Sequence, residues 1–175
     1  MTHDAMPDGR RRPQPMWVDE TDLTQLAQRL RVGPGELLAA IGGPWFVMRR
    51  DESDEMLRPG TLFVGRAGPS VGILIDDGDR WLRIGPSSGQ WQGPAALRWA
   101  IVEPIVELAV PGVDAAAADV DALVARLGAT VDAVAAERAA RLVTCRYCGS
   151  VVAPEHALGV ELCQACGSRV FGIVY

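Results

Sequence analysis

The sequence predicts an α+β fold with four parts: an N-terminal helical hairpin, a small antiparallel β-rich domain, a long α-helix and a C-terminal module that holds all four cysteines. Three observations lead to this prediction. Apolar residues recur at helical spacing in residues 19–43 and 114–142. Short apolar runs divided by turn residues fill the stretch between them. The length of 175 residues and the 49% apolar content suffice for one main domain and a small appendage.

The N-terminal residues 1–16 are polar and rich in proline, so we expect a disordered tail that is not a secretory signal. Arg10, Arg11 and Arg12 are candidates for contact with phosphate or an acidic partner, although a solvated tail is the simpler interpretation. No run of 18 apolar residues is present, so we predict no membrane span and a cytoplasmic protein.

The main domain is expected over residues 17–110, and it opens with the helical hairpin at 19–43. Asp22 is placed to cap the first helix, and Gly33-Pro34-Gly35 breaks the chain before the second. The expected apolar faces are Leu23, Leu26, Ala27 and Leu30 in the first helix, and Leu37, Leu38 and Ile41 in the second.

The spacing of these apolar residues over 22–41 resembles a helix-turn-helix, which implies a DNA-binding regulator. The second helix, PGELLAAIGG, has no Arg, Lys, Asn or Gln to meet base edges. The net charge of −5 also argues against a general nucleic-acid-binding surface. We therefore favour a hairpin packed on its own protein or on a protein partner, with DNA binding as the alternative.

Residues 44–110 are expected to be β-rich, with strands in WFVMRR, TLFVGR, VGILID and RWLRIG. The acidic stretch 76–79 is predicted to be a hairpin turn rather than a calcium loop, because it lacks the remaining ligands. Residues 95–110 fit a strand or a helix, and Pro104 interrupts either. The tryptophans are expected to pack in the core or at an interface, and Trp91, in a glycine-rich loop, is the candidate for contact with a partner.

Residues 111–142 are expected to form a linker and one long helix over 114–142, with Asp114 as its cap and Gly128 as its weak point. Its apolar seam must be buried against its own domain or, in a homo-oligomer, against a second copy. The seam consists of Val120, Leu123, Leu127, Val131, Val134 and Leu142.

The four cysteines form two Cys-x-x-Cys-Gly-Ser repeats near the C-terminus, Cys145 with Cys148 and Cys163 with Cys166. This spacing is typical of a four-cysteine metal site, because each tight turn directs two sulfurs at one point. The glycine after each pair, Gly149 or Gly167, is expected to adopt a positive φ.

Residues 143–175 resemble the zinc-ribbon family, in which two such knuckles are joined by a β-hairpin and closed by a further strand. The resemblance implies one structural Zn²⁺ on Cys145, Cys148, Cys163 and Cys166, and a third strand over 169–175. Strands are expected at 150–152 and 160–162, with residues 153–159 as the connecting loop. His156, in that loop, is expected to be exposed and not a ligand, because four thiolates already close the coordination shell.

Three other chemistries also use paired cysteines: two disulfides, redox chemistry by one pair, and iron binding. A reducing compartment disfavours disulfides, and a redox motif needs only one pair, opening a helix. Rubredoxin-type iron sites separate their knuckles more widely. Zinc is therefore favoured.

The sequence contains no convincing catalytic set, since no nucleophile has a base at hand. The leading hypothesis is a non-enzymatic adaptor or assembly protein that binds another macromolecule, more readily a protein than a nucleic acid. The alternatives are a transcription-type regulator and an enzyme whose site forms at an oligomer interface.

Overall fold

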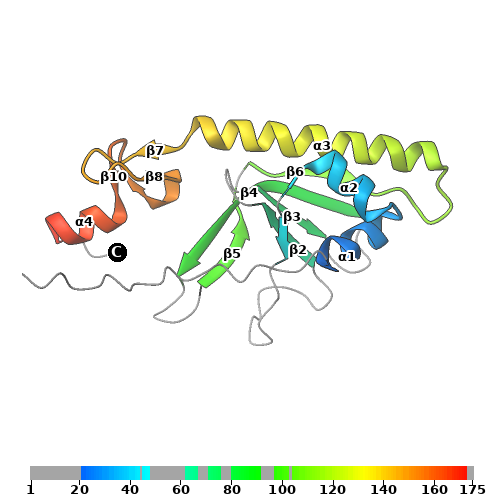
Figure 1. The fold of residues 1–175 in the computed structure, drawn as a ribbon, viewed down its shortest axis with the longest axis horizontal. Coiled ribbons are helices and arrows are strands. Elements are labelled where there is room, and N and C mark those ends of the chain that lie inside the picture. Colours follow the sequence, from blue (N-terminus) through cyan, green and yellow to red (C-terminus); the bar gives the residue numbers. More distant parts are fainter. Residues whose placement is uncertain are drawn as a thin grey trace, which may run out of the picture.

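The computed structural model describes residues 21–43, 45–47, 62–66, 71–75, 80–91, 97–102 and 104–172. These residues form four α-helices, an antiparallel six-stranded sheet and two small two-stranded sheets (Figure 1). The predicted α+β fold, with its long helix and C-terminal cysteine cluster, is confirmed. In the described segments, no helix combines the length and the apolar character needed to cross a bilayer.

The helical hairpin consists of α1 (Thr21–Leu30) and α2 (Pro34–Ile41). Asp22 lies inside α1 rather than before it, so its predicted capping role is not seen. The buried apolar side chains are Leu26, Ala27, Leu30, Leu37 and Ile41, as expected, whereas Leu38 is exposed. Gly42, with φ +65°, ends α2 and donates its backbone N–H to the Leu38 carbonyl.

Arg31 closes α1 in a left-handed conformation, φ +59°, that non-glycine residues seldom adopt. Its guanidinium donates to the carbonyl of Pro111 at 3.0 Å and also to those of Gly112 and Val113. These bonds tie the turn between α1 and α2 to the segment that precedes the long helix. They provide the tertiary support that an unfavourable φ requires.

The main sheet contains β1 (Trp45–Val47), β2 (Leu62–Arg66), β3 (Val71–Ile75), β4 (Trp81–Trp91), β5 (Leu97–Ile101) and β6 (Val106–Ala109). Strands β1 to β4 pair in sequence order, and every pairing in the sheet is antiparallel. The long β4 pairs with β6 through its first half and with β5 through its second half. The ambiguous residues 95–110 therefore include two strands, with Pro104 between them.

Gly85 lies where β4 passes from one partner strand to the other. A Cβ atom there would lie 2.6 Å from the Ile101 side chain and 2.9 Å from the Pro104 carbonyl oxygen. Val102 donates its backbone N–H to the Pro86 carbonyl at 2.8 Å at the same place. Only glycine allows the connection between β5 and β6 to approach β4 this closely.

The long helix α3 (Ala117–Ala140) begins later than predicted, with Ala116 at the N-cap and no capping side chain, so Asp114 does not cap it. It lies along one face of the sheet beside α2 (Figure 1). Its seam residues Leu123, Leu127, Val131 and Val134 belong to the same buried core as α1, α2 and the sheet. The seam is thus buried by this chain itself, without a second copy.

Candidate metal centre

The C-terminal module, residues 143–172, contains two small sheets and one helix. Strand β7 (Val143–Thr144) pairs with β8 (Val151–Val152), and β9 (Ala157–Leu158) pairs with β10 (Leu162–Cys163). A short 3₁₀ helix, η1 (Pro154–His156), precedes β9, and α4 (Gln164–Phe171) follows β10. The expected strand at 150–152 is present as β8. The one expected at 160–162 is largely a turn, since β10 begins only at Leu162.

The first knuckle has the predicted geometry. Gly149 donates its backbone N–H to the Cys145 carbonyl at 2.8 Å and has φ +70°. Cys145 in turn donates to the Ser150 carbonyl at 2.8 Å. The positive φ of Gly149 brings the chain back from Cys148 to β8, as the spacing predicts.

The second knuckle differs from the first and corrects two predictions. Cys163 is the N-cap of α4, and its sulfur accepts the backbone N–H of Cys166 at 3.4 Å. Gly167 lies within α4 and is not among the glycines with positive φ, so its predicted conformation is wrong. The predicted third strand over 169–175 is also wrong, because α4 continues to Phe171; residues 173–175 lie outside the described chain.

A helix N-terminus explains why the second knuckle needs no left-handed glycine. In the first turn of α4, the backbone N–H of Cys166 is satisfied by the Cys163 sulfur, which acts as the capping side chain. Gly172, with φ +65°, ends the helix in the left-handed conformation instead. The module therefore departs from a ribbon closed by a strand, while it keeps the two-knuckle cysteine arrangement.

All four cysteine sulfurs lie within 4.8 Å of one another and could hold a metal ion. The sulfurs of Cys148 and Cys163 are 3.8 Å apart, well beyond the roughly 2.05 Å of a disulfide, and all four cysteines are free. Cys145 and Cys163 are buried, and Cys148 is exposed. No other group of three or more His, Cys, Asp or Glu side chains with this spacing occurs in the described chain.

The crowded thiols have unequal acidity. The pKa of Cys145 is lowered to about 6, mainly because its sulfur accepts a backbone hydrogen bond from Cys163. The pKa of Cys148 is lowered chiefly by the hydroxyl of Ser150. The pKa of Cys166 is raised to about 12, first by its hydrogen bond with Cys148 and then by burial. Four thiolates in one place repel one another, and a bound cation would remove that cost.

Two contacts hold the knuckles together. Arg146, from the first knuckle, donates its backbone N–H to the Glu161 carbonyl at 2.9 Å, and the two side chains form an exposed ion pair at 3.0 Å. The ring of Tyr147 meets that of Phe171, in α4, edge to face with centroids 5.5 Å apart. Both contacts link the first knuckle to the segment that contains the second.

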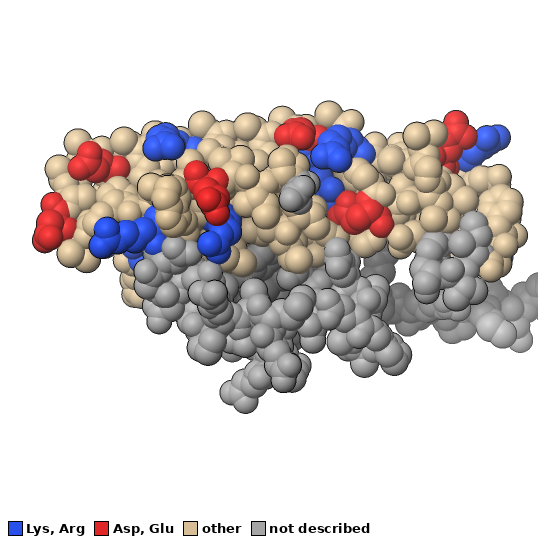
Figure 2. Space-filling model, turned by 180° about the vertical axis from the view of Figure 1, so that it is seen from behind, with Lys and Arg blue, Asp and Glu red and all other residues tan. Residues whose placement is uncertain are grey.

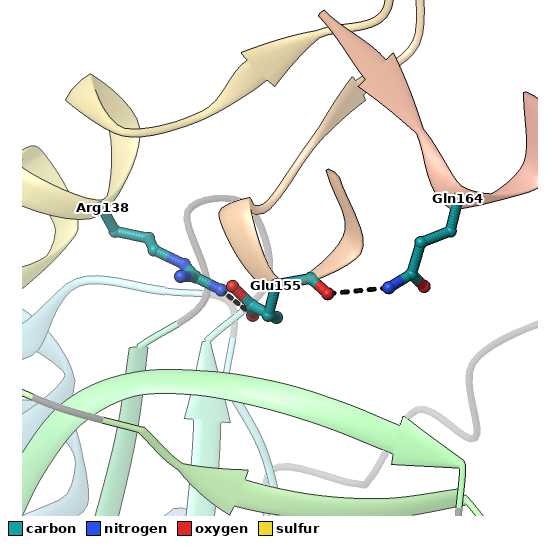
Figure 3. A network of polar contacts seen from close by, with 3 residues as sticks. All are labelled: Arg138, Glu155 and Gln164. Carbon is teal, nitrogen blue, oxygen red and sulfur yellow. Dashed lines mark hydrogen bonds and ion pairs between the residues drawn. The ribbon is translucent and has the colours of Figure 1, made fainter. Parts of the chain in front are cut away.

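A polar network that sequence analysis missed joins the module to α3 (Figure 3). Arg138, only 5% exposed, donates to the carboxylate of Glu155 in η1. The Gln164 side-chain amide donates to the backbone carbonyl of Glu155 at 3.0 Å. No local pattern could have indicated the contact, because Arg138 looks like any surface arginine near a helix C-terminus.

The remaining candidate residues are not brought to the cysteine cluster. His156 is half-buried rather than exposed as predicted, and it is not among the clustered ligands. Arg10, Arg11 and Arg12 lie outside the described residues, as does the acidic turn 76–79. Trp91 is the last residue of β4, and its side chain is not among those that the structure describes.

Comparison with known proteins yields no relationship: no family model, curated protein or solved structure matches this chain.

Proposed function

We propose that this chain is a non-enzymatic adaptor whose C-terminal module, held by one structural Zn²⁺, binds a protein partner. The observation that carries the proposal is the cluster of four free cysteine sulfurs within 4.8 Å. With Zn–S bonds of about 2.3 Å, a tetrahedral site has sulfurs roughly 3.8 Å apart. The 3.8 Å separation of the Cys148 and Cys163 sulfurs fits that edge.

Cys145, Cys148, Cys163 and Cys166 would be the ligands. Four thiolates leave no open position for water, so the ion would stabilise the module rather than act on a substrate. A module of about 30 residues buries too little surface to fold unaided, and metal binding supplies the missing stability. A cytoplasmic location, where thiols stay reduced, is part of this proposal.

The candidate partner surface is the knuckle surface, defined by exposed apolar and aromatic side chains around the cysteines: Tyr147, Val151, Val160, Val170 and Phe171. In a module this small, such side chains beyond the core are available for a contact, and aromatic residues are enriched at protein interfaces. Arg146 lies 5.8 Å above the Tyr147 ring and adds a donor beside it.

The charge distribution supports a protein partner over nucleic acid. On the face in Figure 2, the acidic and basic side chains of the described residues are interspersed rather than gathered by sign. In α2, the helix that would read bases in a helix-turn-helix, Glu36 is the single charged side chain, and Leu37 and Ile41 are buried. A transcription-type regulator remains the alternative, and the experiment below distinguishes the two.

The test begins with elemental analysis of protein purified under reducing conditions, where we expect about one equivalent of zinc per chain. Iron, or no metal, would contradict the proposal. The second step compares partners that co-purify with the wild type, with Tyr147→Ser, and with Val113→Ser as the control. Val113 is also an exposed apolar residue, with 83% of its surface exposed, but it lies before α3 and outside the module.

We expect one protein to be lost with Tyr147→Ser and kept with Val113→Ser, at unchanged zinc content. Its retention should survive nuclease and high salt. Retention that nuclease or salt abolishes would favour the nucleic-acid alternative instead.

A further inference from the structure

Arg138 is a buried cation at the end of α3, and its described partner lies in another part of the fold. Its side chain is 5% exposed, and the ion pair with Glu155 spans 17 positions along the chain. A buried guanidinium without a carboxylate is strongly unfavourable. The last turn of α3 therefore depends on the module for its charge balance.

Glu155 is positioned by the second cysteine pair. Its backbone carbonyl accepts the Gln164 side-chain amide at 3.0 Å, and Gln164 directly follows Cys163. Cys163 is the buried sulfur that lies 3.8 Å from Cys148. A continuous path thus runs from Cys163 to its neighbour Gln164 and on through Glu155 to Arg138. Figure 3 shows the last three of these residues.

The carboxylate of Glu155 is kept ionised where it meets the main fold. Burial raises its pKa, but the hydrogen bond and charge of Arg138 outweigh this, with a contribution from the Ser88 hydroxyl, and the net pKa is lowered. Ser88 lies on β4 and is 2% exposed; its hydroxyl makes no hydrogen bond of ordinary geometry with the described residues. The module and α3 therefore meet at this carboxylate.

In the described part of the chain, the extensive contacts of β7, β8, β9, β10 and α4 are all with one another. The hydrophobic core contains residues of α1, α2, α3 and the sheet, and none of the module. The Arg138–Glu155 pair is thus a polar contact between two separately packed parts, and it is broken when one of its members moves.

We propose that the Arg138–Glu155 ion pair is a metal-controlled latch: the metal-bound module docks on the end of α3, and loss of the metal releases it. The proposal rests on the metal site proposed above. A metal on Cys163 holds the start of α4, and with it Gln164, at the place from which Glu155 is positioned. Without the metal, Gln164 and η1 are no longer fixed, and Arg138 loses its partner.

The experiment is hydrogen exchange on the full-length chain, read on three peptides: residues 130–141 for the docked end of α3, 151–158 for η1, and 71–75 for the sheet core. The samples are the zinc-loaded wild type, the same protein after chelation with a reductant present, and zinc-loaded Glu155→Gln. The matched control is zinc-loaded Glu161→Gln, which removes a glutamate–arginine pair that is exposed and lies within the module.

We expect exchange in 130–141 to rise on the order of a hundredfold in the chelated wild type and in Glu155→Gln, because a buried charge is left without its partner. Glu161→Gln should leave it unchanged. The peptide 71–75 should stay protected in every sample, and Glu155→Gln should keep about one zinc per chain.

A second variant tests the latch independently, in case Glu155→Gln causes a general loss of fold. Gln164→Ala removes the hydrogen bond to the Glu155 carbonyl and no charge, so we expect zinc to be kept and exchange in 130–141 to rise roughly fivefold. Unchanged protection of 130–141 after chelation, or in zinc-loaded Glu155→Gln, would overturn the latch while leaving the zinc site in place. A chain that binds no zinc would overturn the metal site itself, and elemental analysis identifies that outcome separately.

Discussion

Gly128 shows how one residue can carry a packing role that its sequence context hides. In an isolated helix a glycine lowers the stability of the helix, and its replacement by alanine would stabilise the helix by about 1 kcal/mol. In the folded chain, a Cβ at this position would lie 2.4 Å from the backbone carbonyl oxygen of Ala40, in α2. The close approach of α2 and α3 therefore requires the glycine.

We predict that Gly128→Ala lowers the free energy of unfolding by about 1–3 kcal/mol despite the better helix former, because α2 must shift away. The control is Gly35→Ala, in α2, where no atom lies within 4 Å of the added methyl group. That variant should be neutral or stabilised by up to about 1 kcal/mol. Urea denaturation measures both, and a Gly128→Ala protein as stable as Gly35→Ala would contradict the assigned contact.

The unequal pKa values of the cysteines lead to a prediction about protons. At about pH 8, Cys145, with a pKa of about 6, is already a thiolate, whereas Cys166, with a pKa of about 12, is protonated. Zinc displaces thiol protons, so binding at that pH should release about one proton from Cys166 and few from Cys145. Below about pH 6 Cys145 is protonated as well. Zinc binding then releases more protons, and the zinc affinity falls more steeply as the pH is lowered.

Calorimetry in two buffers of different ionisation enthalpy counts the released protons. Zinc binding without proton release at about pH 8 would show that Cys166 is not a protonated ligand. Replacing this ligand, as in Cys166→Ser, should lower the proton release at that pH by about one proton.

At the scale of elements, α3 is a central part of the core rather than a spacer. Its side chains at Leu127 and Val131 are fully buried between α2 and the sheet. The periodic apolar pattern correctly indicated a buried seam, but it could not indicate what covers the seam. A helix seam looks the same in sequence whether it packs on a sheet or on a second copy.

We predict that Leu127→Glu unfolds the main domain, with a loss of at least about 4 kcal/mol, because a carboxylate would be buried without a partner. Ala125→Glu, on the exposed face of α3, should change stability by about 0.5 kcal/mol or less. Circular dichroism melting measures both. A folded Leu127→Glu protein that only halves its mass in solution would favour the dimer interpretation over the intramolecular core.

At the scale of the whole molecule, we propose a main fold and a module with separate sources of stability. The apolar core consists of helices and sheet, and the module contains the cysteine cluster that would hold the metal. The boundaries between them, 17–110, 111–142 and 143–175, remain our proposal. On this view α3 belongs with the main fold, since its seam is part of that core.

We predict that Cys163→Ser loses zinc and unfolds residues 143–172, while the sheet keeps its protection against hydrogen exchange to within about threefold. Ala165→Ser, which places a hydroxyl between the same two cysteines, should keep both zinc and module. If the peptides of β3 and β4 lose protection together with the module, the cysteine site also supports the main core.

Features that depend on local chemistry could be predicted from the order of residues alone. Residue spacing predicted the buried seam of α3, the apolar faces of the hairpin, and the four-cysteine cluster with its left-handed Gly149. In each case, neighbours a few positions apart must share a face or a turn, so the pattern is complete within a short segment.

Features that need partners from distant parts of the chain became visible only in the folded protein. The alternation at 169–172 is typical of a strand, yet Cys163 at the N-cap and Gly172 at the end make this segment part of a helix. The partner of the α3 seam and the glycine requirement at 128 come from α2 and the sheet. The Arg138–Glu155 pair joins two segments that no periodicity connects. Burial of a charge or of a backbone is decided by what folds against it, and that information is spread over the whole chain.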